Sequence, residues 1–237
     1  MNPIYKIGHR GAKGHITENT LESINLALEM GVDGIEIDVH VCASGELVVF
    51  HDFALDRLTD GSGEVTVKTY GQLQQLKLKG GYKIPLLTEV LDLIEGKCSV
   101  NIELKGLHTA KPTCAIISKY INKGWDYNSI LVSSFQENEL LEAKKINANI
   151  LIAVLSKASV EEAIEWAKIL NATAIHPSLG IITRQSVIDA HNKGFNVNVW
   201  TVNEPEDIAR MIEFGVDGII SDYPDRLISI IGESLEE

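Results

Sequence analysis

The sequence predicts an α/β protein, a (β/α)8 barrel of the TIM type with a small insertion after the second strand. Short β-rich runs alternate with amphipathic stretches along the chain, which is typical of a parallel sheet with helical crossovers. The alternation gives eight strand–helix units, and 237 residues suit the size of such a barrel. Glycines stand where several helices are expected to stop, which supports this division into units.

Eight strands are predicted from short runs of β-branched and other apolar residues, most of which end in polar residues. In chain order they are Tyr5–His9, Gly34–Val41, Ser99–Lys105, Ser129–Ser134, Ile150–Leu155, Thr173–His176, Asn196–Thr201 and Gly218–Asp222. After the second of them, a turn at residues 43–46 is expected to lead into an additional short strand, Leu47–His51.

Helix signals lie between these strands. The segment Leu21–Met30 carries apolar residues at helical spacing. Helix starts are expected at capping residues, namely Ser159 with Glu162, Asn203 with Glu206, and Thr88 before a helix over Glu89–Glu95. Helix ends are expected at glycines, namely Gly31, Gly124, Gly194 and Gly215.

Residues 53–84 interrupt this rhythm, because they carry Gly, Lys and Thr without a clear period. We interpret them as a small insertion on a barrel loop that is too short to be an independent domain. The expected organisation is therefore a single barrel domain over residues 1–237.

Composition and charge exclude several classes of partner. With 33 acidic and 21 basic residues the net charge is −12, which repels phosphate-rich polymers. We therefore expect no nucleic-acid partner. The chain shows neither a signal peptide at its start nor the roughly 18 consecutive apolar residues of a membrane span, so no stable membrane insertion is expected. Three cysteines without a pairing pattern favour reduced thiols and a cytoplasmic location: Cys42, Cys98 and Cys114.

Two pairs of ionisable residues, Glu36-x-Asp38 and Glu103-x-Lys105, lie at or near the ends of apolar runs. Residues two apart on a strand project from the same face, so each pair is expected to point toward one site. Converging carboxylates repel each other unless a positive group lies between them. Glu36, Asp38 and Glu103 are therefore predicted to hold one divalent cation, Mg²⁺ or Ca²⁺, which prefer carboxylate oxygens.

Other polar residues collect at the carboxyl ends of the predicted strands, where barrels of this type build their active sites. They are His9 with Arg10, His51 with Asp52, His176, Trp200 and Asp222. By contrast, the histidines at 15, 40, 108 and 191 are expected to be structural or solvated.

The order of these motifs resembles the glycerophosphodiester phosphodiesterase family, in its bacterial cytosolic type. The similarity is carried by His9-Arg10-Gly11, Glu18-Asn19-Thr20, Glu36-x-Asp38, His51-Asp52 and Glu103-x-Lys105, and then by Ser134-Phe135, Trp200-Thr201 and Ser221-Asp222. It covers nearly the whole chain. The resemblance implies metal-assisted hydrolysis of glycerophosphodiesters, such as glycerophosphocholine or glycerophosphoethanolamine, to glycerol 3-phosphate and an alcohol.

Within this interpretation, each residue type has a chemical reason. Arg10 and Lys105 are expected to neutralise charge that grows on the phosphate in the transition state. His9 is predicted as the general base and His51 as the general acid, since both protonation states of a histidine are accessible near neutral pH. Trp200 is predicted to cover the glycerol carbons, with simple packing as the open alternative.

His176 is predicted to contact the substrate or simply to end its strand. Glu18 and Asn19 are expected to brace the first loop. The nucleophile is either water or the glycerol 2-hydroxyl, which would give a cyclic intermediate.

Two other functions stay open. The first is a phospholipid-directed enzyme on the same barrel that acts on lysophospholipids or forms cyclic phosphates. The second is a non-catalytic barrel that binds glycerophosphodiesters. Homo-oligomer formation also stays open.

Overall fold

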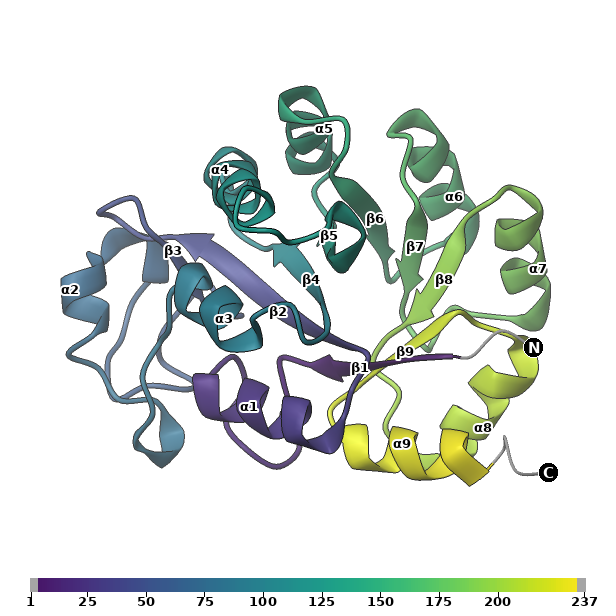
Figure 1. Cartoon of the computed structure of the whole chain (residues 1–237), viewed down its shortest axis with the longest axis horizontal. Coiled ribbons are helices and arrows are strands. Elements are labelled where there is room, and N and C mark those ends of the chain that lie inside the picture. The colour runs from purple at the N-terminus through teal and green to yellow at the C-terminus, as the bar shows by residue number, and fades with distance from the viewer. Residues whose placement is uncertain (1–3, 234–237) are drawn as a thin grey trace.

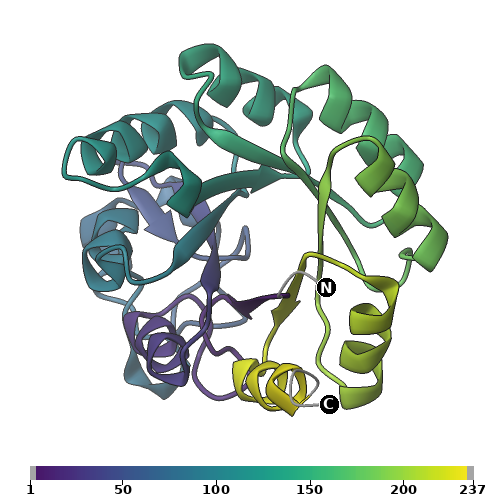
Figure 2. The ribbon, with the colours of Figure 1, turned by 45° about the vertical axis from the view of Figure 1, so that its right-hand side comes forward.

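The computed structural model describes residues 4–233 of the chain, so the limits of the predicted domain, residues 1 and 237, lie outside the described residues. Parallel strands form a closed barrel and helices surround it on the outside (Figures 1 and 2). The predicted (β/α)8 fold is confirmed. The strands are β1 (Tyr5–His9), β2 (Gly34–Val41), β3 (Leu47–Val49), β4 (Ser99–Leu104), β5 (Ile130–Ser134), β6 (Leu151–Ser156), β7 (Ala174–Pro177), β8 (Asn196–Val199) and β9 (Gly218–Ser221).

The strand order is β1-β9-β8-β7-β6-β5-β4-β2, and β1 pairs with β2 to close the barrel. These pairings are parallel, whereas the additional strand β3 pairs with β2 antiparallel. Where observed strand ends differ from the predicted ones, they differ by one or two residues. For example, β4 ends one residue before the predicted end Lys105, whereas β6 and β7 each run one residue further than predicted, to Ser156 and Pro177.

The helices that cover the barrel are α1 (Leu21–Met30), α3 (Leu87–Ile94), α4 (Ala110–Ile121), α5 (Glu137–Ile146), α6 (Val160–Ile169), α7 (Arg184–Asn192), α8 (Pro205–Phe214) and α9 (Pro224–Glu233). Their apolar faces pack on the outer faces of the strands in one large core. Helix α1 has the predicted bounds, and Gly31 ends it in the left-handed conformation with φ +83°. Within the described residues, no helix is long and apolar enough to cross a membrane.

Two predicted helix caps are wrong. Thr88 lies inside the first turn of α3, because the Glu89 carboxylate accepts the Leu86 N–H at 2.7 Å and the helix therefore begins at Leu87. Asn203 does not cap α8, because its side chain binds elsewhere. Its Oδ1 accepts the backbone N–H of Asp222 at 2.9 Å, and its Nδ2 donates to the Asp222 carboxylate at 3.0 Å.

The insertion after β3 holds short helical segments, η1 (Val65–Val67), α2 (Tyr70–Leu73) and η2 (Lys79–Gly81), and isolated antiparallel β-bridges. It lies beside the barrel at one end of the molecule (Figure 1). Its buried side chains form a small second core that includes Leu55, Leu58 and Leu73 and extends to Val48 of β3. Because this core shares a barrel-attached strand, we propose that the insertion folds as part of the barrel domain. The remaining short segment is η3 (Tyr127–Ser129) before β5.

Candidate active site

A cavity of about 340 Å³ opens at the carboxyl ends of the barrel strands. Its walls come from strand ends and from the loops that follow them, as this architecture requires. The lining residues are His9, Arg10, Glu36, His51, Asn101, Glu103, Lys105, Ser133, Phe135, Leu155, Lys157, Trp200 and Ile220. Most of the site residues predicted from the sequence are therefore brought together around one cavity. Asp38 is fully buried beside it, and His176 lies elsewhere.

The three predicted metal ligands lie close together. The β2–β4 register places Asp38 directly beside Glu103, and Glu36 lies two residues before Asp38 on β2. One carboxylate oxygen from each of the three lies within 4.8 Å of the others, and all three residues are buried. Among the described residues, Asp38 Oδ1 is one of the buried polar atoms without a hydrogen-bond partner. Buried carboxylates with a free oxygen suit a hard divalent cation, so this cluster is a candidate metal site.

The electrostatics of the cluster show how unfavourable it is for three charges to share this space. Burial, with added repulsion from Asp38, raises the pKa of Glu103 to about 7. Burial and the charges of Asp38 and Glu103 raise the pKa of Glu36 well above its ordinary value. Asp38 behaves differently: burial opposes its charge, but Arg10, His51 and Lys105 lower its pKa to about 2. The cluster therefore favours the charged form of Asp38 and disfavours the charged forms of Glu36 and Glu103.

Arg10 and Lys105 are the cationic groups nearest to these carboxylates. Arg10 Nε lies 3.2 Å from Asp38 Oδ2, and the backbone N–H of Arg10 donates to Glu36 Oε2 at 3.1 Å. Lys105 Nζ lies 2.9 Å from Glu103 Oε1 and 3.7 Å from Asp38 Oδ1. Arg10 has φ +53°, an unfavourable conformation for a residue other than glycine, which surrounding contacts must hold in place. Both cations line the cavity, so they face any anion that enters it.

His9 and His51 are each oriented by an aspartate. His9 Nδ1 donates to Asp222 Oδ1 at 2.6 Å, and His51 Nδ1 donates to Asp52 Oδ1 at 2.6 Å. Because a carboxylate only accepts, Nδ1 carries the proton in both rings and Nε2 is left for proton transfer. Burial lowers the pKa of both histidines.

The family model for glycerophosphoryl diester phosphodiesterases matches this chain over residues 9–226. The chain belongs to that family. A glycerophosphodiester phosphodiesterase of Caldanaerobacter subterraneus subsp. tengcongensis is 36% identical over 236 residues, which cover 95% of this chain and 96% of that protein. One from Bacillus altitudinis is 34% identical over 234 residues, covering 94% and 96% of the two chains.

Solved structures of similar proteins agree with this assignment. A phosphodiesterase of Oleispira antarctica in complex with the product sn-glycerol-3-phosphate has a TM-score of 0.88 and 30% identity, covering 95% of this chain and 96% of that one. A glycerophosphodiester phosphodiesterase of Thermotoga maritima has a TM-score of 0.80 and 27% identity, covering 97% and 99%. The predicted family and the predicted enzyme class are thus confirmed. The chain is an enzyme of the glycerophosphodiester phosphodiesterase class.

An aromatic pair forms the outer part of the phosphodiesterase cavity. The rings of Phe135 and Trp200 meet edge to face with centroids 5.6 Å apart, and Phe135 is 40% exposed. Lys105 Nζ and Lys157 Nζ lie 5.8 and 6.0 Å from the centre of the Phe135 ring. These two perpendicular rings, the aromatic rim, offer apolar surface next to positive charge.

His176 is not brought to this cavity. Its side chain is fully buried and lines a separate hollow, together with residues from the amino-terminal half of the barrel strands such as Tyr5, Ser99 and Asn196. Its Nε2 accepts from Asn198 Nδ2 at 3.0 Å, and its backbone oxygen accepts from Trp200 Nε1 at 2.7 Å. The geometry thus gives His176 a role in holding Trp200, whereas substrate contact by its imidazole stays a prediction without a supporting distance.

Two residues at or near the site, Arg57 and Lys157, were not identified from the sequence. Arg57 lies in the insertion, where the sequence has no period that would show which side chains face the barrel. Lys157 follows β6 and was detectable only by its place just after a strand end. Glu18, which was expected to brace the first loop, accepts from Arg10 Nη1 at 2.6 Å and also from Arg57.

Proposed function

We propose that this enzyme hydrolyses glycerophosphodiesters, such as glycerophosphocholine and glycerophosphoethanolamine, to glycerol 3-phosphate and an alcohol, and that it uses one Mg²⁺ or Ca²⁺ ion. One observation carries the proposal: two histidines, each hydrogen-bonded to an aspartate, line the same cavity as Glu36 and Glu103 of the buried carboxylate cluster. The product bound in the Oleispira antarctica structure supports glycerol 3-phosphate as one of the two products of this enzyme.

Glu36, Asp38 and Glu103 would hold the cation. When bound, a divalent ion neutralises negative charge on a phosphoryl oxygen and offsets the repulsion among its own ligands. Arg10 and Lys105 extend this positive surface. Arg10 presents a planar fork of donors and Lys105 a compact charge, and both suit a phosphate oxygen.

Proton transfer falls to the two histidines. His9 Nε2 acts as the base that removes the proton from the attacking hydroxyl, and a new P–O bond forms. The P–O bond to the alcohol breaks, and His51, which enters this step protonated on both ring nitrogens, gives its Nε2 proton to the departing oxygen. His51 is the more exposed of the two side chains, 26% against 9%, which suits a group beside a leaving alcohol that departs to solvent. The attacking hydroxyl belongs either to water, which gives glycerol 3-phosphate directly, or to carbon 2 of the glycerol, which gives a cyclic phosphate that a water molecule must then open to glycerol 3-phosphate.

The aromatic rim suits the apolar edge of glycerol. Trp200 lies at the cavity wall, held through its indole N–H by the His176 carbonyl. A fixed indole covers glycerol carbons at little entropic cost. We propose that the enzyme recognises the glycerol phosphate half that all its substrates share.

The experiment uses the purified full chain with glycerophosphocholine and either Mg²⁺, Ca²⁺ or EDTA, and it measures release of glycerol 3-phosphate. We expect activity with one or both metals and loss of activity in EDTA that added metal restores. Full activity in EDTA would contradict the metal assignment, and absence of product under all conditions would contradict the substrate class. Lysophosphatidylcholine serves as a comparison substrate. Faster release of choline from it than from glycerophosphocholine would favour the phospholipid-directed alternative.

We also propose a cytoplasmic location. Cys42, Cys98 and Cys114 are free thiols in the structure, and Cys42 and Cys114 are buried. Unpaired cysteines are usual in a reducing compartment. Fractionation of the source cells with an activity assay would test this location.

A further inference from the structure

Arg57 is an arginine of the insertion whose guanidinium bonds two carboxylates from different loops. We propose that Arg57 is a positioning residue that holds the side chains of His51 and Arg10 in a fixed arrangement relative to each other. It acts on His51 through Asp52 and on Arg10 through Glu18. This inference rests on the proposed function, because it assigns Arg57 its role through the proposed acid His51 and the phosphate-binding Arg10.

The Asp52 side of the arrangement is bidentate. Arg57 Nε donates to Asp52 Oδ2 at 2.5 Å, and Arg57 Nη2 donates to Asp52 Oδ1 at 2.9 Å. The same Oδ1 accepts from His51 Nδ1 at 2.6 Å. Arg57 therefore holds the carboxylate that sets the orientation and tautomer of the His51 ring.

Through Glu18, Arg57 is connected to Arg10, the residue proposed to bind the phosphate. Arg57 Nη2 donates to Glu18 Oε1 at 2.7 Å and Arg57 Nη1 to Glu18 Oε2 at 3.2 Å. Oε1 also accepts from Arg10 Nη1 at 2.6 Å. The Glu18 side chain is only 4% exposed, so loss of one of its two arginines would leave a poorly compensated buried charge.

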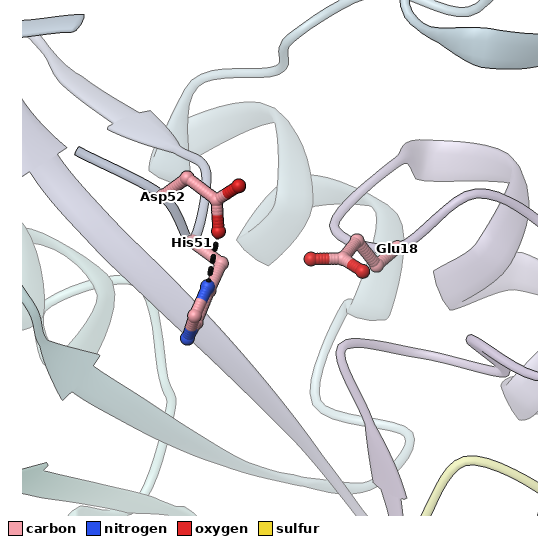
Figure 3. Close-up of side chains that lie close together, drawn as sticks. All are labelled: Glu18, His51 and Asp52. Atoms are coloured by element: carbon pink, nitrogen blue, oxygen red, sulfur yellow. Dashed lines mark hydrogen bonds and ion pairs between the residues drawn. The ribbon is translucent and has the colours of Figure 1, made fainter. Parts of the chain in front are cut away.

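Arg57 also compensates the charge of a second group of potential metal ligands. Glu18, His51 and Asp52 offer ligand atoms within 4.8 Å of one another. In Figure 3 the Glu18 carboxylate extends from its own loop toward the His51–Asp52 pair, which is joined by its hydrogen bond. Both carboxylates already bond the Arg57 guanidinium. The fixed charge of Arg57 thus compensates these acids, and a metal ion there would have to displace it.

The insertion supplies the anchor for this contact. Leu55 and Leu58 on either side of Arg57 are buried in the small second core, and the Thr59 N–H donates to the Leu55 carbonyl at 3.0 Å. The backbone of Arg57 is therefore fixed by packing although its side chain is 46% exposed. In this view the insertion serves catalysis by presenting one arginine to the rim of the barrel.

The test compares Arg57→Ala and Arg57→Lys with Arg210→Ala, a control that removes a surface arginine paired with Asp207 on α8. Arg57→Ala should lower kcat for glycerophosphocholine by about 10- to 100-fold, the usual loss when a group that orients a catalytic residue is removed. Arg57→Lys should recover little, because an ammonium cannot replace the fork, whereas added guanidinium ion should restore part of the activity of Arg57→Ala. The control should keep wild-type activity.

A double-mutant cycle separates positioning from a merely structural effect. If Arg57 acts through His51 and Arg10, Arg57→Ala should cost less in the His51→Ala background than in the wild type, with the remaining cost due to Arg10, so the two losses should be clearly less than additive. Two results would overturn the inference about Arg57 but not the proposed function. The first is additive losses, and the second is a wild-type kcat for Arg57→Ala when His51→Ala is inactive. A fully active His51→Ala enzyme would instead overturn the proposed function. If Arg57→Ala fails to fold, the kcat of Arg57→Lys decides, and a wild-type value would refute the role of the fork.

Discussion

Metal binding at the carboxylate cluster should be coupled to proton release. In the metal-free protein, burial and repulsion from Asp38 hold the pKa of Glu103 at about 7, and the pKa of Glu36 is raised as well. A cation needs these groups in their charged form, so it must compete with protons. Lowering the pH from 8 to 6 should therefore weaken metal binding.

The size of the effect follows from the pKa of Glu103. For a group that titrates at about 7, the charged fraction falls from roughly 90% at pH 8 to roughly 10% at pH 6. Glu103 alone should therefore weaken the affinity for Ca²⁺ by about tenfold across this range, or about 1.4 kcal/mol. Proton uptake by Glu36 adds to this loss in the same direction.

Isothermal titration calorimetry of the metal-free protein with Ca²⁺ measures both quantities. Titrations at pH 6 and pH 8, each in two buffers of different ionisation enthalpy, give the dissociation constant and the number of protons released. Glu206→Gln on the exposed face of α8 is the control and should leave both unchanged, whereas Glu103→Gln should bind metal weakly and depend less on pH. Equal dissociation constants at the two pH values, with binding enthalpies independent of the buffer, would refute the reasoning.

Three further predictions concern other parts of the site and the fold. His9→Ala and His51→Ala should each lower kcat by roughly 10²-fold, and a p-nitrophenyl diester should rescue only His51→Ala, because that leaving group needs no proton; equal rescue of both would remove the support for the assignment of acid and base. The wild-type enzyme should have kcat/KM values for choline, ethanolamine and glycerol diesters within about tenfold of one another, and Trp200→Ala should raise KM for all three by a similar factor. A thousandfold preference for one head group would contradict recognition of the shared glycerol phosphate half. Leu55→Ala, in the small second core, should lower the free energy of unfolding by about 2–5 kcal/mol in denaturant titrations, and an unchanged midpoint would show that this core does not stabilise the enzyme.

The barrel and most of its site were predictable because both depend on local sequence periods. Strand β2 alternates apolar residues with Glu36, Asp38 and His40, and successive side chains of a strand point to opposite faces, so its ionisable side chains share one face. Glu36 and Asp38 could therefore be placed on one face from their spacing alone. Pairing in register with β4 then brought Glu103 beside them.

The parts that sequence reasoning missed depend on contacts without a period. Arg57 reaches its two carboxylates across different loops, at sequence separations of 39 and 5 residues. Asn203 has the sequence signature of a helix cap, but a tertiary partner, Asp222, uses its side chain instead. His176 ends a strand as the active-site residues do, yet its side chain turns toward the other part of the barrel interior.

The charges of the site argue for a particular kind of ligand. Three ionised carboxylates against Arg10 and Lys105 leave one net negative charge, and the raised pKa values of Glu36 and Glu103 favour removal of that excess by proton uptake in the metal-free protein. With a divalent cation bound and all three carboxylates ionised, the cluster carries one net positive charge. A phosphodiester carries a single negative charge, so this positive cluster attracts it. The product, glycerol 3-phosphate, carries nearly two negative charges at neutral pH and is attracted at least as strongly, so it should compete with the substrate for the cluster.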